Sequence, residues 1–326
     1  MKAINFDEFG PASVLKLSEA PDPILRPNDL LVRTRAAGVN RADLTHRRGG
    51  YGRPDFGDST IMGLEIAGDV IAVGENVRGY TVGDRVMGIV GGGAYAEIAR
   101  IDYRMAMPIP EKMDYIHAAA ITEVFVTANE ALINLGQLQA GETVLVHAGA
   151  GGVGGAAVQL AHAVGATVLT TAKKEAHGLV HQLGADYAID YENEDFTDVV
   201  ARVTEGKGVD LILDFIGAPY LSRNVNALNF GGRLVQIGIM GGIENAQLPL
   251  DRVLYRHLRI MGTVMKSRSQ DVKQAMSQRF RERWLTHFSE ASLNPIIDSV
   301  FPLAEASAAH QRMEDGLNVG KIVLTM

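Results

Sequence analysis

The chain has 326 residues, of which 47% are hydrophobic and 21% charged, so it is long enough for about two domains with their own cores. The formal net charge is −7, from 31 Lys and Arg against 38 Asp and Glu, which disfavours nucleic-acid binding because that function needs clustered cations. There is no cysteine, which excludes disulfides, thiolate zinc sites, iron–sulfur clusters and thiol nucleophiles.

The sequence shows no sign of membrane attachment. The N-terminal residues contain no apolar segment and no lipidation motif, so neither a signal peptide nor a lipid anchor is indicated. Residues 143–172 carry no charged side chain, but six glycines, two histidines and a glutamine interrupt them, whereas a membrane span needs about 20 continuous apolar residues. We therefore expect a cytoplasmic protein that does not bind membranes.

From residue 1 to 121, short apolar runs alternate with turns rich in Gly, Pro and Asp. Such runs lie at 30–34, 66–73 and 84–87. Many short strands between turn signals predict an irregular, antiparallel β-domain.

From residue 122 to 264, short β-type runs alternate with longer amphipathic stretches. The runs are 144–146, 167–170, 187–189, 211–213 and 234–237. This alternation predicts a doubly wound parallel sheet with helices on both faces, in an α/β fold. Residues 258–264 are expected to form its last strand. An exposed edge strand invites pairing with a second copy, so we expect a homodimer, or a tetramer built from dimers.

Residues 265–326 predict a helix at 270–288, a strand at 296–301, a helix at 304–313 and a strand at 321–324. No new Gly-rich turn precedes the last strand, so we expect the tail to return to the first domain. The predicted domains are therefore 1–121 together with 265–326, and 122–264.

A glycine-rich turn follows the first strand of the second domain. The segment 148–155 (AGAGGVGG) contains Gly149, Gly151 and Gly154 in the spacing of a dinucleotide-binding fingerprint. The first glycine would permit the sharp turn, the second would let backbone approach a pyrophosphate, and the third would let the helix pack on the strand. The N–H groups at the helix start would then hold the phosphates. This pattern predicts a Rossmann domain.

The end of the second strand of this domain distinguishes NAD from NADP. A site for NAD places Asp or Glu here to bind the ribose 2′-hydroxyl. This chain instead has Lys173 and Lys174 after Thr171, and their charges would pair with a 2′-phosphate. The alternative is that both lysines only solvate a helix start, and Glu175 would weaken the preference. We predict NADPH as the cofactor.

Several segments together resemble the zinc-independent, zeta-crystallin-like quinone oxidoreductase branch of the medium-chain dehydrogenase/reductase superfamily. They are the glycine turn, 36–44 (AAGVNRADL), 49–51 (GGY), 63–68 (GLEIAG), 82–86 (VGDRV), 183–186 (LGAD) and 318–324 (NVGKIVL). The segments 224–228, 238–242 and 266–269 are similar in particular to the tumour-suppressor-inducible quinone oxidoreductases. The resemblance implies a β-rich, GroES-like domain beside the Rossmann domain, with the substrate cleft between them.

The resemblance also implies the absence of zinc. Zinc-containing members place a cysteine ligand at the position of Asn40 and a His–Glu pair at Leu64 and Glu65, and they carry a four-cysteine lobe further on. The thiolates and the ligand histidine are missing here. His177 and His181 are spaced like metal ligands, but a solvated helix face is the favoured interpretation because no third ligand is evident.

Without zinc to polarise a carbonyl, we expect an acceptor that takes hydride readily, such as a quinone or an α,β-unsaturated carbonyl compound. Tyr51 matches the family's active-site tyrosine and would donate a hydrogen bond to the acceptor oxygen. Asn40 would position the acceptor or the nicotinamide. A surface-loop aromatic for Tyr51 and a loop-capping amide for Asn40 are the alternatives.

The resemblance implies further cofactor contacts from segments spread along the chain. Gly152 and Val153 would lie at the pyrophosphate, Thr127 at the first helix of the cofactor domain, and Tyr191 near the 2′-phosphate. The residues expected near the ribose and nicotinamide are Phe215, Ile216, Ile239 and Met240. Arg268 or Lys321 would lie near the interdomain cleft. Core packing is the alternative for the four apolar residues.

The predicted function is NADPH:quinone oxidoreductase activity without zinc, on a small quinone or enone substrate. One alternative is an enoyl or alkenal reductase, which differs only in the acceptor. An alternative of another class is a non-catalytic NADPH-binding protein, crystallin-like or RNA-binding. The acidic net charge and the lack of a basic, aromatic-interleaved run argue against nucleic acid.

Overall fold

The computed structural model describes residues 1–50 and 59–326, which divide into two compact units. One unit comprises Met1–Val126 with Lys266–Met326, and the other is Thr127–Met265. The domain borders expected from the sequence, at 121/122 and 264/265, fall close to these divisions.

The first unit is built on a seven-stranded sheet whose pairs are antiparallel apart from β14–β15. Its strands are β3 (Asp29–Val39), β4 (Glu65–Val73), β5 (Arg85–Ile89), β6 (Ile98–Asp102), β7 (Ala106–Pro108), β14 (Ile297–Pro302) and β15 (Lys321–Thr325). The order is β14-β15-β3-β4-β5-β7, and β6 also pairs with β3. A separate pair joins β1 (Lys2–Asn5) to β2 (Lys16–Glu19). The predicted antiparallel β-domain is confirmed.

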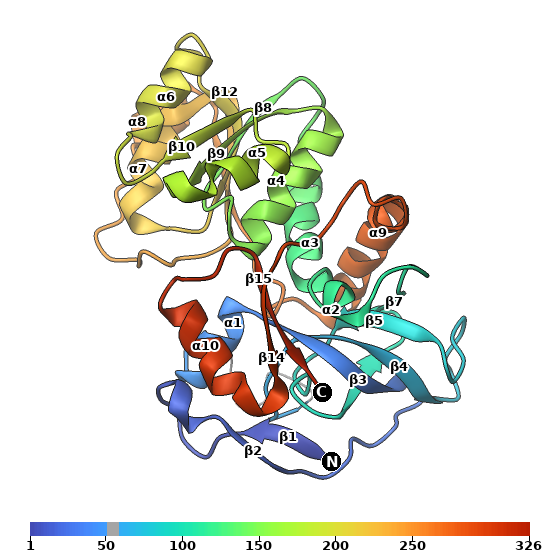
Figure 1. The fold of residues 1–326 in the computed structure, drawn as a ribbon. Helices are drawn as coiled ribbons and strands as arrows, with labels where there is room; N and C mark the ends of the chain where they lie inside the picture. The colour runs from blue at the N-terminus through green and yellow to red at the C-terminus, as the bar shows by residue number, and fades with distance from the viewer. Residues whose placement is uncertain (51–58) are drawn as a thin grey trace. The chain divides into compact units, whose positions relative to one another are not determined.

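The C-terminal tail completes this first sheet, as predicted. Strand β15 pairs antiparallel with β3, and Ile322 lies opposite Val39 (Figure 1). Because the strands are antiparallel, Lys321, which precedes Ile322, comes close to Asn40, which follows Val39. The last strand therefore delivers a charged side chain to the point where β3 ends.

Helices cover the first sheet and fill its core. They are α1 (Arg41–Arg47), α2 (Tyr115–Ala118), α3 (Thr122–Asn129), α9 (Gln270–Ser289) and α10 (Ala306–Glu314), with short 3₁₀ turns at Ala12–Val14 and Leu303–Glu305. Helix α3 runs across the border between the units. On α9, Phe288 packs edge-on against Phe125 with ring centroids 4.9 Å apart. The predicted helices at 270–288 and 304–313 are confirmed, the second with its first residues in the 3₁₀ turn.

The second unit is a six-stranded parallel sheet. Its strands are β8 (Thr143–Val146), β9 (Thr167–Ala172), β10 (Tyr187–Asp190), β11 (Val209–Asp214), β12 (Leu228–Gln236) and β13 (Arg259–Gly262). They lie in the order β10-β9-β8-β11-β12-β13, which is the 3-2-1-4-5-6 order of dinucleotide-binding domains. Every predicted strand of this domain is present, and β13 is the edge strand.

The helices of the second unit lie in two layers. They are α4 (Gly152–Val164), α5 (His177–Gln182), α6 (Phe196–Val203), α7 (Ala218–Ala227) and α8 (Leu250–Tyr255), with a π-helical turn at Glu130–Leu135 and a 3₁₀ turn at Lys174–Ala176. Right-handed crossovers put α4 and α5 on one face and α6 to α8 on the other (Figure 1). Strand order reverses between β8 and β11, and ligands of such sheets bind at the carboxyl ends of these strands.

One helical run, Tyr115–Leu135, is long and apolar enough to cross a membrane by length and composition. However, 72% of its apolar window is buried in the structure, which is typical of a core helix. The predicted absence of membrane binding stays a prediction.

Candidate functional site

The glycine turn joins β8 to α4 at the switch point of the parallel sheet. The residue with left-handed backbone is Ala148, with φ of 53°, and Gly151 caps α4 in an extended conformation. The fingerprint assigns the sharp bend to Gly149, but this glycine is needed for another reason. A Cβ on Gly149 would overlap the Thr170 hydroxyl of the neighbouring strand β9.

The other two glycines of the fingerprint differ in how much room surrounds them. A Cβ on Gly154 would overlap the carbonyl oxygen of Ala148, which confirms close packing of the helix on the turn. A Cβ on Gly151 would meet only that same oxygen, at 3.2 Å. The protein therefore leaves the face of Gly151 nearly open. This cradle, beside the N–H groups that have no partner within α4, fits a dinucleotide pyrophosphate.

Thr171 supports the turn from beneath. Its hydroxyl accepts from the backbone N–H of Ala148 at 3.1 Å and lies 3.2 Å from Nδ1 of His147, whose Nε2 lies 2.7 Å from Oδ1 of Asn224. Burial lowers the pKa of His147, so this ring is neutral. With Nε2 as the donor to Asn224, Nδ1 accepts from Thr171. Thr171 is thus buried in the scaffold of the turn, and we assign it a supporting role.

The ends of β9 and β10 carry charges of both signs. Lys173 and Lys174 are exposed just beyond β9, as expected for a 2′-phosphate site. However, Asp190 lies in register with Ala172 of β9, and Nζ of Lys173 lies 3.8 Å from a carboxylate oxygen of Glu192. A search for an acid on β9 alone misses Asp190 at the end of β10 and Glu192 in the turn that follows it. The segment 190–194 (DYENE) was the available signal.

Asp190 is held by its own turn. Its carboxylate accepts from Nδ2 of Asn193 at 2.7 Å and from the backbone N–H of Glu192 at 3.2 Å. The side-chain bond from Asn193 is the main reason that the pKa of Asp190 lies below its usual value. Tyr191, expected near a 2′-phosphate, is exposed in the same turn.

The loops that follow β11 and β12 are joined by backbone hydrogen bonds. The N–H of Met240 donates to the carbonyl of Phe215 at 2.9 Å, and the N–H of Gly241 donates to Ile216 at 2.8 Å. Asp214 closes the first loop by accepting from the N–H of Ile216 at 2.7 Å. The structure thus brings together the four apolar residues expected near the ribose and nicotinamide. Phe215 is buried, whereas Ile239 and Met240 are exposed and available to a ligand.

The remaining expected cofactor residues lie elsewhere. Thr127 is half-buried in α3, Arg268 is half-buried before α9, and Gly152 and Val153 form the first turn of α4. Tyr51 lies outside the described residues, so its role stays a prediction.

In the first unit, Lys321 and Asn40 meet in a buried ionic cluster. The ammonium of Lys321 lies 2.7 Å from a carboxylate oxygen of Glu65 and donates to Oδ1 of Asn40 at 2.6 Å and to the carbonyl of Val39 at 3.1 Å. The ammonium thus makes two hydrogen bonds and one ion pair. Lys321 is only 3% exposed. Its charge therefore serves Glu65 and Asn40, and the cofactor contact that the resemblance implied stays a prediction.

Asn40 also begins a second buried chain of polar groups. Its backbone N–H donates to Asp43 at 2.9 Å, in the capping box that starts α1. The Tyr95 hydroxyl lies 3.1 Å from both Asp43 and Nε2 of His310, and Nη1 of Arg47 lies 3.3 Å from Nδ1 of that ring. Sequence reasoning missed Asp43, Tyr95 and His310, because they come from three distant segments.

Burial shifts the ionisation of these groups. It raises the pKa of Asp43 to about 7, and with the neighbouring Glu65 it raises the pKa of Glu123 to about 8. It lowers the pKa of His310 to about 3, with the Arg47 guanidinium adding to the effect. The cluster therefore holds a neutral imidazole and carboxyl groups that retain protons near neutral pH.

The residues at the expected zinc position do not fit that ion. Asn40 and Glu65 both bind the ammonium of Lys321, so a cation already occupies the space between their oxygens. Among the described residues, no group of three or more His, Asp or Glu gathers as metal ligands, and the chain has no cysteine. His181 bonds through Nδ1 to the carbonyl of Ala185 at 2.8 Å, which closes its helix end.

Comparisons with known proteins agree with this arrangement. Residues 26–111 match the alcohol dehydrogenase GroES-like domain, and residues 152–281 match the zinc-binding dehydrogenase domain. The chain is 33% identical to the quinone oxidoreductase of Homo sapiens, over 100% of this chain and 98% of that protein.

Three solved structures superpose on essentially the whole chain. An NAD-dependent alcohol dehydrogenase has a TM-score of 0.89 at 31% identity, over 100% of both chains. The Escherichia coli quinone oxidoreductase complexed with NADPH has a TM-score of 0.90 at 25% identity, over 100% of both chains. The CurK enoyl reductase has a TM-score of 0.88 at 27% identity, over 100% of this chain and 99% of its own.

The space around the fingerprint glycines predicts a contrast between two substitutions. Gly151→Ala should lower the unfolding temperature much less than Gly154→Ala does, but it should raise the Michaelis constant for the nicotinamide dinucleotide about tenfold, because the methyl group faces the pyrophosphate cradle. Gly154→Ala should instead destabilise the fold by about 1–3 kcal/mol through overlap with Ala148. Thermal unfolding and steady-state kinetics of both variants check this. Equal effects on stability would contradict it.

The buried His310 predicts acid sensitivity of the fold. Its pKa is about 3 when folded and near 6.5 when unfolded, so between these values the unfolded chain binds more protons and acidification destabilises the fold. The raised pKa values of Asp43 and Glu123 mean that the folded protein binds more protons at these groups between about pH 4 and 8, so acidification stabilises the fold through them. This contribution is the same in wild type and variant. Between pH 7 and pH 5, the free energy of unfolding of wild type should therefore fall by about 2 kcal/mol more than that of His310→Gln.

Denaturant unfolding of the two proteins across this pH range measures the difference. Parallel stability curves would show that His310 does not stay neutral in the folded state.

Proposed function

Because the chain belongs to the quinone oxidoreductase branch of the medium-chain dehydrogenase/reductase superfamily, we propose that it transfers hydride from NADPH to a quinone or another conjugated carbonyl compound. Membership makes it an NAD(P)-dependent oxidoreductase. The choice of nucleotide and acceptor, and catalysis without zinc, are our proposal. The observation that carries it is the open cradle at Gly151. The ammonium of Lys321, at the residues that match the zinc ligands of other members, supports catalysis without the metal.

The cofactor supplies the hydride when it is bound, so the protein's own tasks are binding, orientation and hydrogen bonding. The first turn of α4 would hold the pyrophosphate, with Thr171 and His147 keeping the turn in place. Ile239 and Met240 offer exposed apolar surface beside Ile216 to a nicotinamide ring. The cofactor domain is thus suited to hold the dinucleotide along the carboxyl ends of its strands.

The charges beyond β9 support NADPH over NADH. Lys173 and Lys174 offer two ammonium groups to a 2′-phosphate, whereas a ribose hydroxyl gains little from them. Glu192 opposes the preference, but its distance of 3.8 Å from Lys173 and the exposure of both groups make this pair weak. A phosphate with two negative charges should displace it.

The side chains of the first unit favour an acceptor that needs no Lewis acid. Lys321 keeps the Asn40 amide oriented with Oδ1 inward, so the amide is a fixed hydrogen-bonding group. Nδ2 of Asn40 donates one hydrogen to the carbonyl of Gly38 at 3.3 Å. Its second hydrogen and, by family resemblance, the hydroxyl of Tyr51 would donate to the acceptor oxygen as charge develops on it. Quinones and enones suit this site because conjugation delocalises that charge. An enoyl reductase reaction is the second candidate, supported by the likeness to CurK.

Substitution of the two lysines tests the choice of cofactor. Wild type should have a lower Michaelis constant for NADPH than for NADH. In Lys173→Gln with Lys174→Gln the constant for NADPH should rise about tenfold, since charge-assisted bonds to phosphate are lost, while the constant for NADH changes little. The matched variant Glu192→Gln should lower the constant for NADPH. A wild-type preference for NADH would refute the assignment.

A panel of acceptors tests the reaction itself. Stopped-flow mixing of the NADPH-bound protein with quinones, enals and enoyl thioesters should give fastest oxidation with quinones, without added metal and in the presence of a chelator. Faster oxidation by enoyl thioesters would favour the second candidate. No oxidation by any acceptor, with the cofactor bound, would indicate a non-catalytic role.

We also propose a homodimer that pairs the edge strands β13. In the described sheet β13 has a neighbour on one side only, and Ile260 on it is exposed. Sedimentation should give twice the chain mass of 35.0 kDa, and Ile260→Lys should shift the protein towards monomer because a charge opposes strand pairing. A monomeric wild type would exclude this arrangement.

A further inference from the structure

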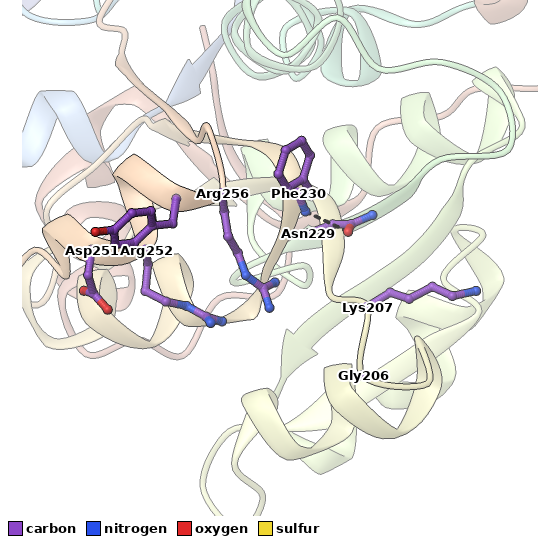
Figure 2. Close-up of a pocket in the computed structure, with 8 residues that line it drawn as sticks. Gly206, Lys207, Asn229, Phe230, Asp251, Arg252 and Arg256 are labelled. Carbon is purple, nitrogen blue, oxygen red and sulfur yellow. Dashed lines mark hydrogen bonds between the residues drawn. The ribbon is translucent and has the colours of Figure 1, made fainter.

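The second unit has a hollow at the edge of its sheet opposite the glycine turn. It measures about 550 Å³, within the range of about 300–1,000 Å³ that small-molecule sites occupy. The residues that line it are Gly206, Lys207, Asn229, Phe230, Asp251, Arg252, Tyr255 and Arg256 (Figure 2). They precede β11, begin β12 or belong to α8 and its C-terminal cap, so the hollow lies at the amino ends of the strands.

The charge of this hollow is opposite to that of the whole chain. Three cations, Lys207, Arg252 and Arg256, face one acid, Asp251, whereas the chain carries a net charge of −7. Figure 2 shows Arg252 and Arg256 extending from α8, whereas Lys207 lies on the other side of the hollow with its side chain directed away from them. Clustered cations at one hollow attract a small anion, and guanidinium groups bind phosphate or carboxylate oxygens in pairs.

The two arginines are held in place before any ligand arrives. Nη2 of Arg252 donates to the carbonyl of Asn226 at 3.1 Å, and Nη1 of Arg256 donates to the carbonyl of Leu228 at 3.0 Å. Because the side chains are already ordered, a ligand loses less entropy on binding them.

Two aromatic rings stand beside the cations. Phe230 is 66% exposed and Tyr255 is 75% exposed, which is high for rings of this size. Phe230 is fixed by the ring of His257, whose centroid lies 5.0 Å away, and the N–H of Gly231 ties this segment to the carbonyl of Arg256 at 2.8 Å. These exposed rings offer a surface on which a planar apolar group can pack.

We propose that this hollow is a second ligand site, distinct from the dinucleotide site, for a small aromatic anion, of which an aryl phosphate is the best match. The arginines bind the phosphate oxygens, Lys207 adds a positive charge at the edge of the hollow, and the ring of the ligand packs against Phe230 and Tyr255. A phosphate matches three cations better than a carboxylate does, because it offers more oxygens and a second charge. The proposal is independent of the acceptor that the protein reduces.

Calorimetric titration of the full-length protein with phenyl phosphate and with inorganic phosphate tests the site. Phenyl phosphate should bind with a Kd of about 1 mM or tighter, and inorganic phosphate about tenfold more weakly because it lacks the ring. Lys207→Gln should weaken both ligands, whereas Phe230→Leu should weaken phenyl phosphate alone. Both residues are exposed, so neither variant threatens the fold.

Two controls test whether phenyl phosphate binds in this hollow and nowhere else. Lys16→Gln removes an exposed cation far along the chain on β2, and it should leave binding unchanged. Saturating NADPH should also leave phenyl phosphate binding unchanged. The proposal fails if phenyl phosphate does not bind, if NADPH displaces it, or if Lys16→Gln weakens it as much as Lys207→Gln does.

Discussion

The ammonium of Lys321 between Glu65 and Asn40 is the constraint on which the first unit depends. Glu65 is fully buried, and a buried carboxylate without a partner destabilises a protein by about 3–5 kcal/mol. Its partner comes from the last strand of the chain. The ammonium of Lys321 therefore links the pairing of β15 with β3 to the buried Glu65 and to the amide of Asn40.

This arrangement supports the proposal that this dehydrogenase fold works without zinc. In the zinc-containing members, a divalent cation satisfies acidic and thiolate side chains near the reacting centre. Here a side-chain cation satisfies Glu65 and binds the Asn40 amide, and no thiolate is left to compensate. The position keeps a positive charge, but the ammonium of Lys321 is buried and already bound to Glu65, Asn40 and Val39. Under the proposed function, the site would contribute hydrogen bonds, which suits an acceptor that stabilises its own developing charge.

The fold was largely predictable, because its signals are local. Buried parallel strands appear as short apolar runs, and the glycine fingerprint marks one turn among many. The details within that turn were not predictable. The residue with left-handed backbone is Ala148. Gly149 is required because a Cβ there would overlap the Thr170 hydroxyl on the neighbouring strand, and no local pattern reveals that contact. Asp190 escaped notice for the same reason, since it reaches the end of β9 through strand register.

The buried cluster was the hardest part to foresee. In the sequence, Lys321 is interpreted as a cofactor-binding cation. In the structure, the pairing of two distant strands brings it to Val39, 282 residues away, and buries it beside Glu65. Tyr95, His310 and Asp43 are unremarkable in their own segments. Their hydrogen bonds arise from tertiary packing alone. Sequence patterns identify which side chains carry chemistry, whereas burial and partners decide what that chemistry is.

The position of β15 inside the first sheet has a consequence for synthesis of the chain. The strand lies between β14 and β3, yet it is the last element of the first unit to leave the ribosome. The second unit is continuous in sequence and can fold while translation proceeds, but the first must wait for its missing interior strand. Until β15 emerges, the edge of β3 and the carboxylate of Glu65 lack the partners that this strand supplies.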